Sequence, residues 1–161
     1  MRIINIAYVM ILALLLSACD NGDTPKEHVA EIYSVALDSI MKEDPGLNDE
    51  MEYIAIDMTH LNDLDEKDKE EILSFFKKVY KVDVMIATFE ELKEKGLSNP
   101  DNGELYGVLL KLDKVDFKIN NHVFFEASKY RSGLGAIGVE GTIHFNEGEW
   151  EIKELKHTWI S

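Results

Sequence analysis

Residues 108–125 read VLLKLDKVDFKINNHVFF, and this alternating stretch decides the fold. Apolar side chains occupy every second position from 108 to 112 and again from 115 to 119, which is typical of half-buried strands. The parity changes at Asp113-Lys114, where we expect a β-bulge. The polar stretch Asn120-Asn121-His122 predicts the tip of a hairpin.

The length of this tip sets the strand register. A three-residue loop pairs Ile119 with Val123 and Phe117 with Phe125, and it is our preferred reading. A two-residue loop would pair Phe117 with Phe124 instead, and it would turn Val123 to the other face of the sheet.

Alternation continues to the end of the chain. Phe145 and Trp150 flank a second predicted hairpin, whose tip is residues 146–149, and the last residues lie in a strand. We therefore expect a C-terminal antiparallel meander of about four strands that forms a curved sheet.

Residues before the meander predict helices with short strands between them. The first helix should start at a capping box of Thr24 and Glu27, with Pro25 in its first turn, and should end at Asp44-Pro45-Gly46. Short strands are expected at 51–57 and 82–87. Further helices are expected at 66–80 and 88–95, the second with a capping box at Thr88 and a C-terminal Gly96.

This order predicts an α+β fold, with N-terminal helices and interleaved short strands followed by the meander. The chain has 161 residues, 31 acidic and 17 basic side chains, and a net charge of −14. This charge argues against nucleic acid as a partner, because phosphates would be repelled.

The first 18 residues have the anatomy of a secretory signal peptide. Arg2 is followed by an apolar segment at 6–16 and by the small residues Ser17-Ala18. The apolar segment is shorter than the roughly 20 residues that span a membrane. An uncleaved anchor helix is the alternative.

Leu16-Ser17-Ala18-Cys19 resembles the lipobox of bacterial lipoproteins. The resemblance implies cleavage before Cys19 and a thioether between the Cys19 sulfur and diacylglycerol. The two acyl chains, such as palmitate, are enough for stable anchoring. Residues 1–18 are then the signal peptide, 19–24 the lipidated cysteine and flexible spacer, and 25–161 a single domain. Asp20 resembles an inner-membrane retention signal of enteric bacteria, but the Gram type, and hence the membrane, stays open.

One cationic patch stands out in this acidic chain. Lys129, Tyr130, Arg131 and Ser132 precede several glycines, and we predict them as candidate ligand-binding residues that could hold a carboxylate or phosphate. The alternative is that the two cations pair with acids on the sheet surface.

Gly133, Gly135 and Gly138 match the GxGxxG pattern of nucleotide-binding folds. That pattern needs a strand before it and a helix after it, whereas Val139 to Phe145 read as a strand here. We expect no nucleotide, and we expect the glycines to let strands bend or approach closely.

No catalytic motif, metal-ligand spacing or cofactor motif is recognised in the sequence. A weak cation site in the acidic loop around His60 is a minor alternative. His144 should face outward near Glu151. Trp150, Trp159, Tyr130 and Phe124 fit core or sheet-surface positions, and an exposed Phe124 would mark a binding face.

The body also resembles small uncharacterised lipoproteins of Bacillus-type bacteria. The resemblance rests on the Lys-Tyr-Arg-Ser-Gly-Leu-Gly-Ala stretch at 129–136 and the Thr-Trp-Ile-Ser ending at 158–161. It brings no established activity.

The sequence therefore predicts a lipoprotein anchored to the extracytoplasmic face of the bacterial cell membrane. Its expected role is a non-catalytic binding module for a protein, peptide or wall component. A small extracytoplasmic hydrolase or wall-modifying enzyme is the alternative.

Overall fold

The computed structural model describes residues 24–161. The predicted signal peptide, Cys19 and the spacer up to Asp23 lie outside the described residues.

Helices and strands alternate in the first half of the described chain, and strands fill the second half. The elements in chain order are the 3₁₀-helix η1 (Pro25–Glu27), α2 (Val29–Lys42), the 3₁₀-helix η2 (Pro45–Asn48), β1 (Tyr53–Asp57), α3 (Glu66–Tyr80), β2 (Asp83–Ile86), α4 (Phe89–Glu94), β3 (Val108–Phe117), β4 (His122–Ser132), β5 (Gly135–Asn146) and β6 (Glu149–Ile160).

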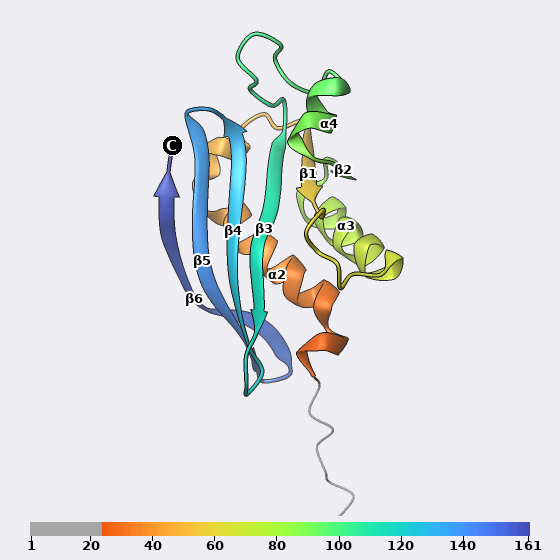
Figure 1. Ribbon diagram of the computed structural model, residues 1–161, viewed down its shortest axis with the longest axis vertical. Coiled ribbons are helices and arrows are strands. Elements are labelled where there is room, and N and C mark those ends of the chain that lie inside the picture. Colours follow the sequence, from red (N-terminus) through yellow and green to blue (C-terminus); the bar gives the residue numbers. More distant parts are fainter. Residues whose placement is uncertain (1–23) are drawn as a thin grey trace, which may run out of the picture.

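The described strands form one six-stranded sheet in the order β2-β1-β3-β4-β5-β6 (Figure 1). Strands β3 to β6 are the predicted antiparallel meander. The two short N-terminal strands join the same sheet, with β1 parallel to both β2 and β3. The α+β prediction is confirmed, and the sheet is mixed because helices connect its parallel strands.

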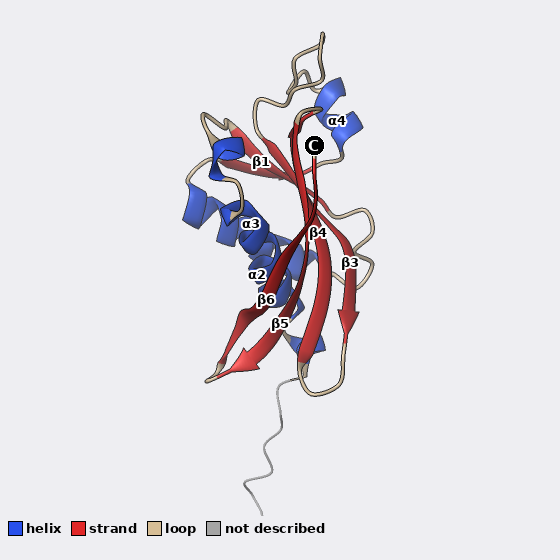
Figure 2. Cartoon of the chain, turned by 90° about the vertical axis from the view of Figure 1, so that its left-hand side faces the viewer, coloured by secondary structure: helices blue, strands red, loops and turns tan. Residues whose placement is uncertain are grey.

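Helices cover the two faces of the sheet unequally. Helix α2 packs against β3 to β6 and against α3, on what we call the inner face, and Figure 2 shows both helices on one side of the strongly twisted sheet. The short helix α4 lies at one end of the molecule. Its Leu92 is buried with Tyr53, Ala55 and Leu109 in a second, smaller cluster on the outer face.

The main core lies between α2, α3 and the inner face. Its fully buried members include Leu37, Ile40, Ile54, Ile56, Ile72, Phe76, Leu110 and Phe125. Burial of these side chains is the dominant stabilising contribution to folding.

The β3–β4 hairpin confirms the predicted bulge and corrects the predicted register. The pairing shifts between Leu112 and Lys114, as expected, but Phe117 pairs with Val123. Ile119 lies in the turn instead and is 87% exposed. The turn is longer than predicted because Asn120 and its neighbour take left-handed conformations, which asparagine tolerates well.

The start of the first helix also differs from the prediction. Residues 25–27 form a 3₁₀ turn in which the Glu27 N–H donates to the Thr24 carbonyl oxygen at 2.9 Å. Helix α2 begins only at Val29, and the Thr24 side chain forms no cap. The prediction of a capping box at Thr24 was therefore wrong, because Pro25 starts a separate short turn.

The predicted ends of α4 are confirmed. Thr88 and Glu91 form a reciprocal capping box. At the other end Gly96 has a φ of 70°, and the Leu97 N–H donates to the Leu92 carbonyl oxygen at 2.9 Å. This is the Schellman ending that the glycine predicts.

Strand β6 forms one edge of the sheet and is irregular. Its pairing with β5 shifts twice, once at Lys153 and once at Thr158, each of which is an extra residue on β6. Bulges of this kind bend a strand and increase its local twist.

Candidate functional site

The four residues predicted as an anion site do not form one surface. They lie on β4, where successive side chains point to opposite faces of the sheet. Lys129 and Arg131 reach toward the segment after α2 on the inner face. Tyr130 points to the outer face, where its ring meets Phe89 at a centroid distance of 5.2 Å.

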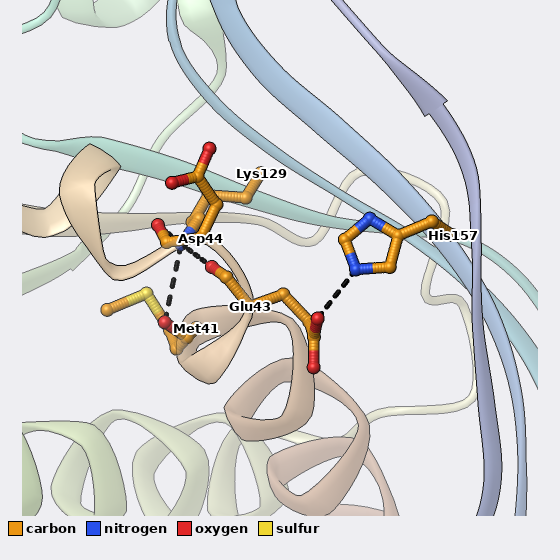
Figure 3. Close-up of polar contacts among 5 residues, drawn as sticks. All are labelled: Met41, Glu43, Asp44, Lys129 and His157. Atoms are coloured by element: carbon orange, nitrogen blue, oxygen red, sulfur yellow. Dashed lines mark hydrogen bonds and ion pairs between the residues drawn. The ribbon is translucent and has the colours of Figure 1, made fainter.

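Lys129 is enclosed by the C-terminal end of α2. The side chain is 0% exposed. Its Nζ donates to the carbonyl oxygens of Met41 at 3.3 Å and Asp44 at 3.1 Å, to that of Glu43, and to Asn48 Oδ1 at 3.0 Å. Figure 3 shows the three carbonyl groups converging on the ammonium. Lys129 thus donates to carbonyl groups at and just after the end of α2. The Met41 carbonyl oxygen also accepts from Asn48 Nδ2, and that of Asp44 also accepts from the Leu47 N–H.

This placement corrects the expectation for Lys129. An ammonium has three N–H donors, and four oxygen atoms surround it here, so no donor remains for an external anion. Arg131 is half-buried and donates from Nη1 to the Leu47 carbonyl oxygen at 3.4 Å. Within residues 24–161 neither cation pairs with a surface acid, and the partners of both are backbone or amide oxygens.

Burial also changes the acidity of Lys129. Loss of solvation lowers its pKa from 10.5 to about 8, opposed by the nearby carboxylates of Asp44 and Glu43. Between these two pH values the unfolded chain holds a proton that the folded protein has released.

We therefore expect the contribution of Lys129 to the free energy of unfolding to rise from about pH 8 to pH 10.5. Urea unfolding at intervals across this range, in wild type and in Lys129→Met, measures it. The difference between the two proteins should increase with pH, and a constant difference would contradict the shifted pKa.

The outer face carries a groove beside α4. Its lining residues are Phe89, Leu109, Lys111, Ser128, Tyr130 and Trp159, and its volume is about 270 Å³. The strand register places Ser128 between Lys111 and Gly138, and Gly138 next to Trp159. The floor therefore crosses β4 and β5, with α4 on one side and the edge strand on the other.

Gly138 determines where the Trp159 side chain lies. A Cβ atom at Gly138 would be 2.1 Å from the indole Nε1, so the indole lies directly over the glycine. Trp159 is still 47% exposed. Within the described chain its Nε1–H donates to no group. The indole thus presents both an apolar face and a polar N–H to the groove.

We expect Gly138→Ala to displace this indole. The added methyl group cannot fit beneath the ring, but an exposed side chain can move away, so the loss of stability should be about 1 kcal/mol. The tryptophan emission should shift to longer wavelength as Trp159 gains exposure. In a Trp159→Phe background Gly138→Ala should leave the emission spectrum unchanged, and a shift there would assign the effect to Trp150 instead.

A second hollow adjoins the groove. It has a volume of about 710 Å³, shares Phe89 and Tyr130 with the groove, and continues to Tyr106, Asn99 and Asn102. The lining residues of both hollows include Lys93 and Lys111 but no carboxylate, although the chain carries 31 acidic residues. The aromatic pair Phe89 and Tyr130 therefore forms a ridge between two hollows whose lining carries no negative charge.

Residues 129–136 and 158–161 meet at this site. The Ser161 N–H donates to the Ala136 carbonyl oxygen at 2.9 Å, and Trp159 pairs with Gly138. Tyr130 from the first stretch and Trp159 from the second line the same groove. Sequence reasoning missed this convergence, and only the shared alternation of β4, β5 and β6 pointed to it.

A polar pocket lies at the other end of the molecule, beside the start of α2. Its volume is about 580 Å³, and Tyr33, His60, Asp63 and Phe117 are among its lining residues. The Tyr33 hydroxyl donates to Asp63 Oδ2 at 2.7 Å. Burial and this carboxylate raise the pKa of Tyr33 well above its usual value, so the phenol stays protonated at neutral pH.

Other side chains singled out in the sequence have local partners. His144 contacts Glu151 Oε1 at 3.1 Å, as predicted, and His157 contacts Glu43 Oε2 at 2.6 Å (Figure 3). Phe124 is half-buried on the outer face with the Lys114 ammonium over its ring. Among residues 24–161, no three His, Cys, Asp or Glu side chains are grouped to hold a metal ion, the acidic loop included.

The glycines of the GxGxxG match lie in the β4–β5 hairpin. Gly133 is in the turn, whereas Gly135 and Gly138 belong to β5, which continues as a strand to Asn146. The helix that a dinucleotide-binding unit places after its glycines is replaced by a strand here. In the part of the chain that the structure describes, no helix is long and apolar enough to cross a membrane.

The chain matches no protein-family model, no curated protein sequence and no solved structure.

Proposed function

We propose that the protein is a lipoprotein anchored through Cys19 to the extracytoplasmic face of the bacterial cell membrane. In this proposal it is a non-catalytic binding module of one domain, residues 25–161. Its ligand occupies the groove and the adjoining hollow. We call these two hollows, with Phe89, Tyr130 and Trp159, the aromatic site.

The position of the aromatic site supports this proposal. The described chain starts at Thr24 at one end of the long axis, and α4 and the C-terminus lie at the other (Figure 1). Strand β6 has 12 residues, which extend over about 40 Å. Four residues separate Cys19 from Thr24, and the five steps from one Cα to the next span at most about 18 Å. A lipid at Cys19 would therefore hold the aromatic site away from the membrane.

The observation that carries the proposal is the exposed aromatic surface itself. Apart from this site, the outer face of the meander is rich in ion pairs, such as Lys114 with Glu126 and Lys156 with Glu140. Trp159 and Tyr106 are 47% and 38% exposed. Clustered apolar surface with a polar margin is typical of binding sites.

The anchor is tested by mass spectrometry of the protein extracted from membranes. We expect the mature chain to start at Cys19 and to carry the added mass of diacylglycerol, and Cys19→Ala should lose both features. A free thiol at Cys19, or an intact leader on the wild-type chain, would refute the anchor.

The binding role is tested by photo-crosslinking in intact cells. A benzophenone amino acid in place of Trp159 should yield a discrete adduct. The same amino acid in place of Phe124, on the same face but outside the aromatic site, should not. Equal adducts from the two positions, or none from either, would contradict a ligand at the aromatic site.

The polar pocket favours one second candidate, the small hydrolase or wall-modifying enzyme. Its Tyr33–Asp63 pair and His60 are ionisable groups that converge on one hollow. If that pocket were catalytic, Asp63→Asn would abolish hydrolysis of wall material while Trp159→Ala would leave the rate unchanged.

A further inference from the structure

We infer that the aromatic site takes a glycan of N-acetylated sugar rings, the chemistry of the wall backbone. This inference rests on the proposed function, because it names the ligand of the same site.

The floor of the aromatic site has no free strand edge. Strand β4 pairs with β3 on one side and β5 on the other, and β5 pairs with β6 beyond it. Extended peptides that add to a sheet gain affinity from main-chain hydrogen bonds to a free edge. On the floor of the site a ligand therefore meets side chains, and the one free edge beside the floor is β6, which two extra residues make irregular.

The side chains present two kinds of contact in alternation. The rings of Trp159 and Tyr130 line the groove, and the C–H face of a sugar ring can stack on such rings. Phe89 packs edge to face with Tyr130, and the Lys93 ammonium lies over its ring. The Nε1–H of Trp159 and the amide of Asn99 lie beside them. Asn99 Oδ1 accepts from the Asp101 N–H at 2.8 Å, which orients its amide group. These are groups that hydrogen-bond to hydroxyl and acetamido substituents.

The charge of the chain limits the classes of ligand that the site can bind. A net charge of −14 repels polyanions such as phosphate-rich wall polymers. The lining of the two described hollows has no carboxylate, so a cationic ligand would meet no ion-pair partner there. A polymer with few charges fits both conditions, and the two lysines accommodate an occasional carboxylate.

The shape of the aromatic site fits two consecutive sugar rings of a glycan. The two hollows, of about 270 and 710 Å³, flank the Phe89–Tyr130 ridge. One sugar unit on each side of this ridge would place one sugar ring beside Trp159 and Tyr130 and the next beside Tyr106 and Asn99. The inference therefore requires at least two linked sugars, and a monosaccharide should bind much more weakly than an oligomer.

The experiment is a calorimetric titration of the full lipid-modified protein in detergent micelles with a soluble β-1,4-linked N-acetylglucosamine pentasaccharide. We expect saturable binding that is at least tenfold weaker in Trp159→Ala and in Asn99→Ala. The matched control Phe124→Ala should bind as the wild type does. Circular dichroism shows whether each variant is folded. If Trp159→Ala does not fold, Asn99→Ala still tests the site.

A second experiment tests whether the protein binds the glycan strands of the wall or their stem peptides. The protein is sedimented with purified wall glycan strands stripped of their stem peptides, and free stem peptides are added as competitors. Binding that the stem peptides abolish, or equal binding by Trp159→Ala, would overturn the glycan assignment. No binding to either sugar probe, together with a protein adduct at position 159 in cells, would refute the glycan and leave the binding role intact.

Discussion

Lys129→Met is expected to lower the free energy of unfolding by about 3 kcal/mol, because it leaves the Glu43 carbonyl oxygen and Asn48 Oδ1 without the charged donor that they accept from. Methionine keeps much of the side-chain length but removes the ammonium from the carbonyl groups of Met41, Glu43 and Asp44 and from Asn48. Urea unfolding at pH 7, followed by circular dichroism, measures the change.

Lys153→Met is the matched control for this prediction. Lys153 is an exposed residue on β6, so the same loss of charge should alter stability by less than about 0.5 kcal/mol. If the two variants lost equal stability, Lys129 would not hold the end of α2 in the way that its contacts indicate.

Gly107→Ala should have an effect of similar size for a different reason. A Cβ atom at Gly107 would lie 2.2 Å from the Tyr53 carbonyl oxygen and 2.6 Å from its ring. The obstacle is backbone, so β1 and β3 would have to move apart where they pair. We expect a loss of about 3 kcal/mol, the upper end for overpacking, measured as a lower urea midpoint.

Gly133→Ala is the control for the steric argument. A Cβ atom there meets nothing within 4 Å, and its φ is not positive. The change should leave stability equal or slightly higher, because alanine restricts the unfolded chain. A loss at Gly133 equal to that at Gly107 would refute the steric explanation.

Local patterns in the sequence predicted most of the elements. The capping residues of α4 act over a single turn, and the bulge in β3 follows from a change of parity between neighbouring residues. The register of the β3–β4 hairpin was missed by two residues because it depends on the turn conformation of Asn120 and Asn121. Since the error was an even number, Val123 and Phe125 kept their predicted face.

The role of Lys129 was missed because lysine is almost never fully buried. The signal was nevertheless present in the parity of β4. Val123 and Phe125 point inward, and the same alternation places Ala127 and Lys129 inward as well. The pattern could not identify the partner of Lys129, because the end of α2 that it contacts lies about 85 residues earlier in the chain.

The aromatic site depends on contacts that no local pattern contains. Phe89 belongs to α4, Tyr130 to β4 and Trp159 to β6, and only the strand order brings them to one groove. The glycine at position 138 was predicted to allow close approach, but the side chain that approaches it was not. Prediction of that pair required the register of β5 with β6, which two bulges interrupt.

The irregular edge strand β6 has a consequence for copies of the protein that are anchored side by side on a membrane. The proposed lipid would concentrate copies of the protein on one membrane surface, where any regular, unpaired strand invites neighbours to polymerise. The two extra residues of β6 break the even spacing of its free N–H and C=O groups, and Glu149, Glu151 and Lys156 add charge along it. A neighbouring chain therefore finds a poor template, so crowding would leave the copies separate and each aromatic site open.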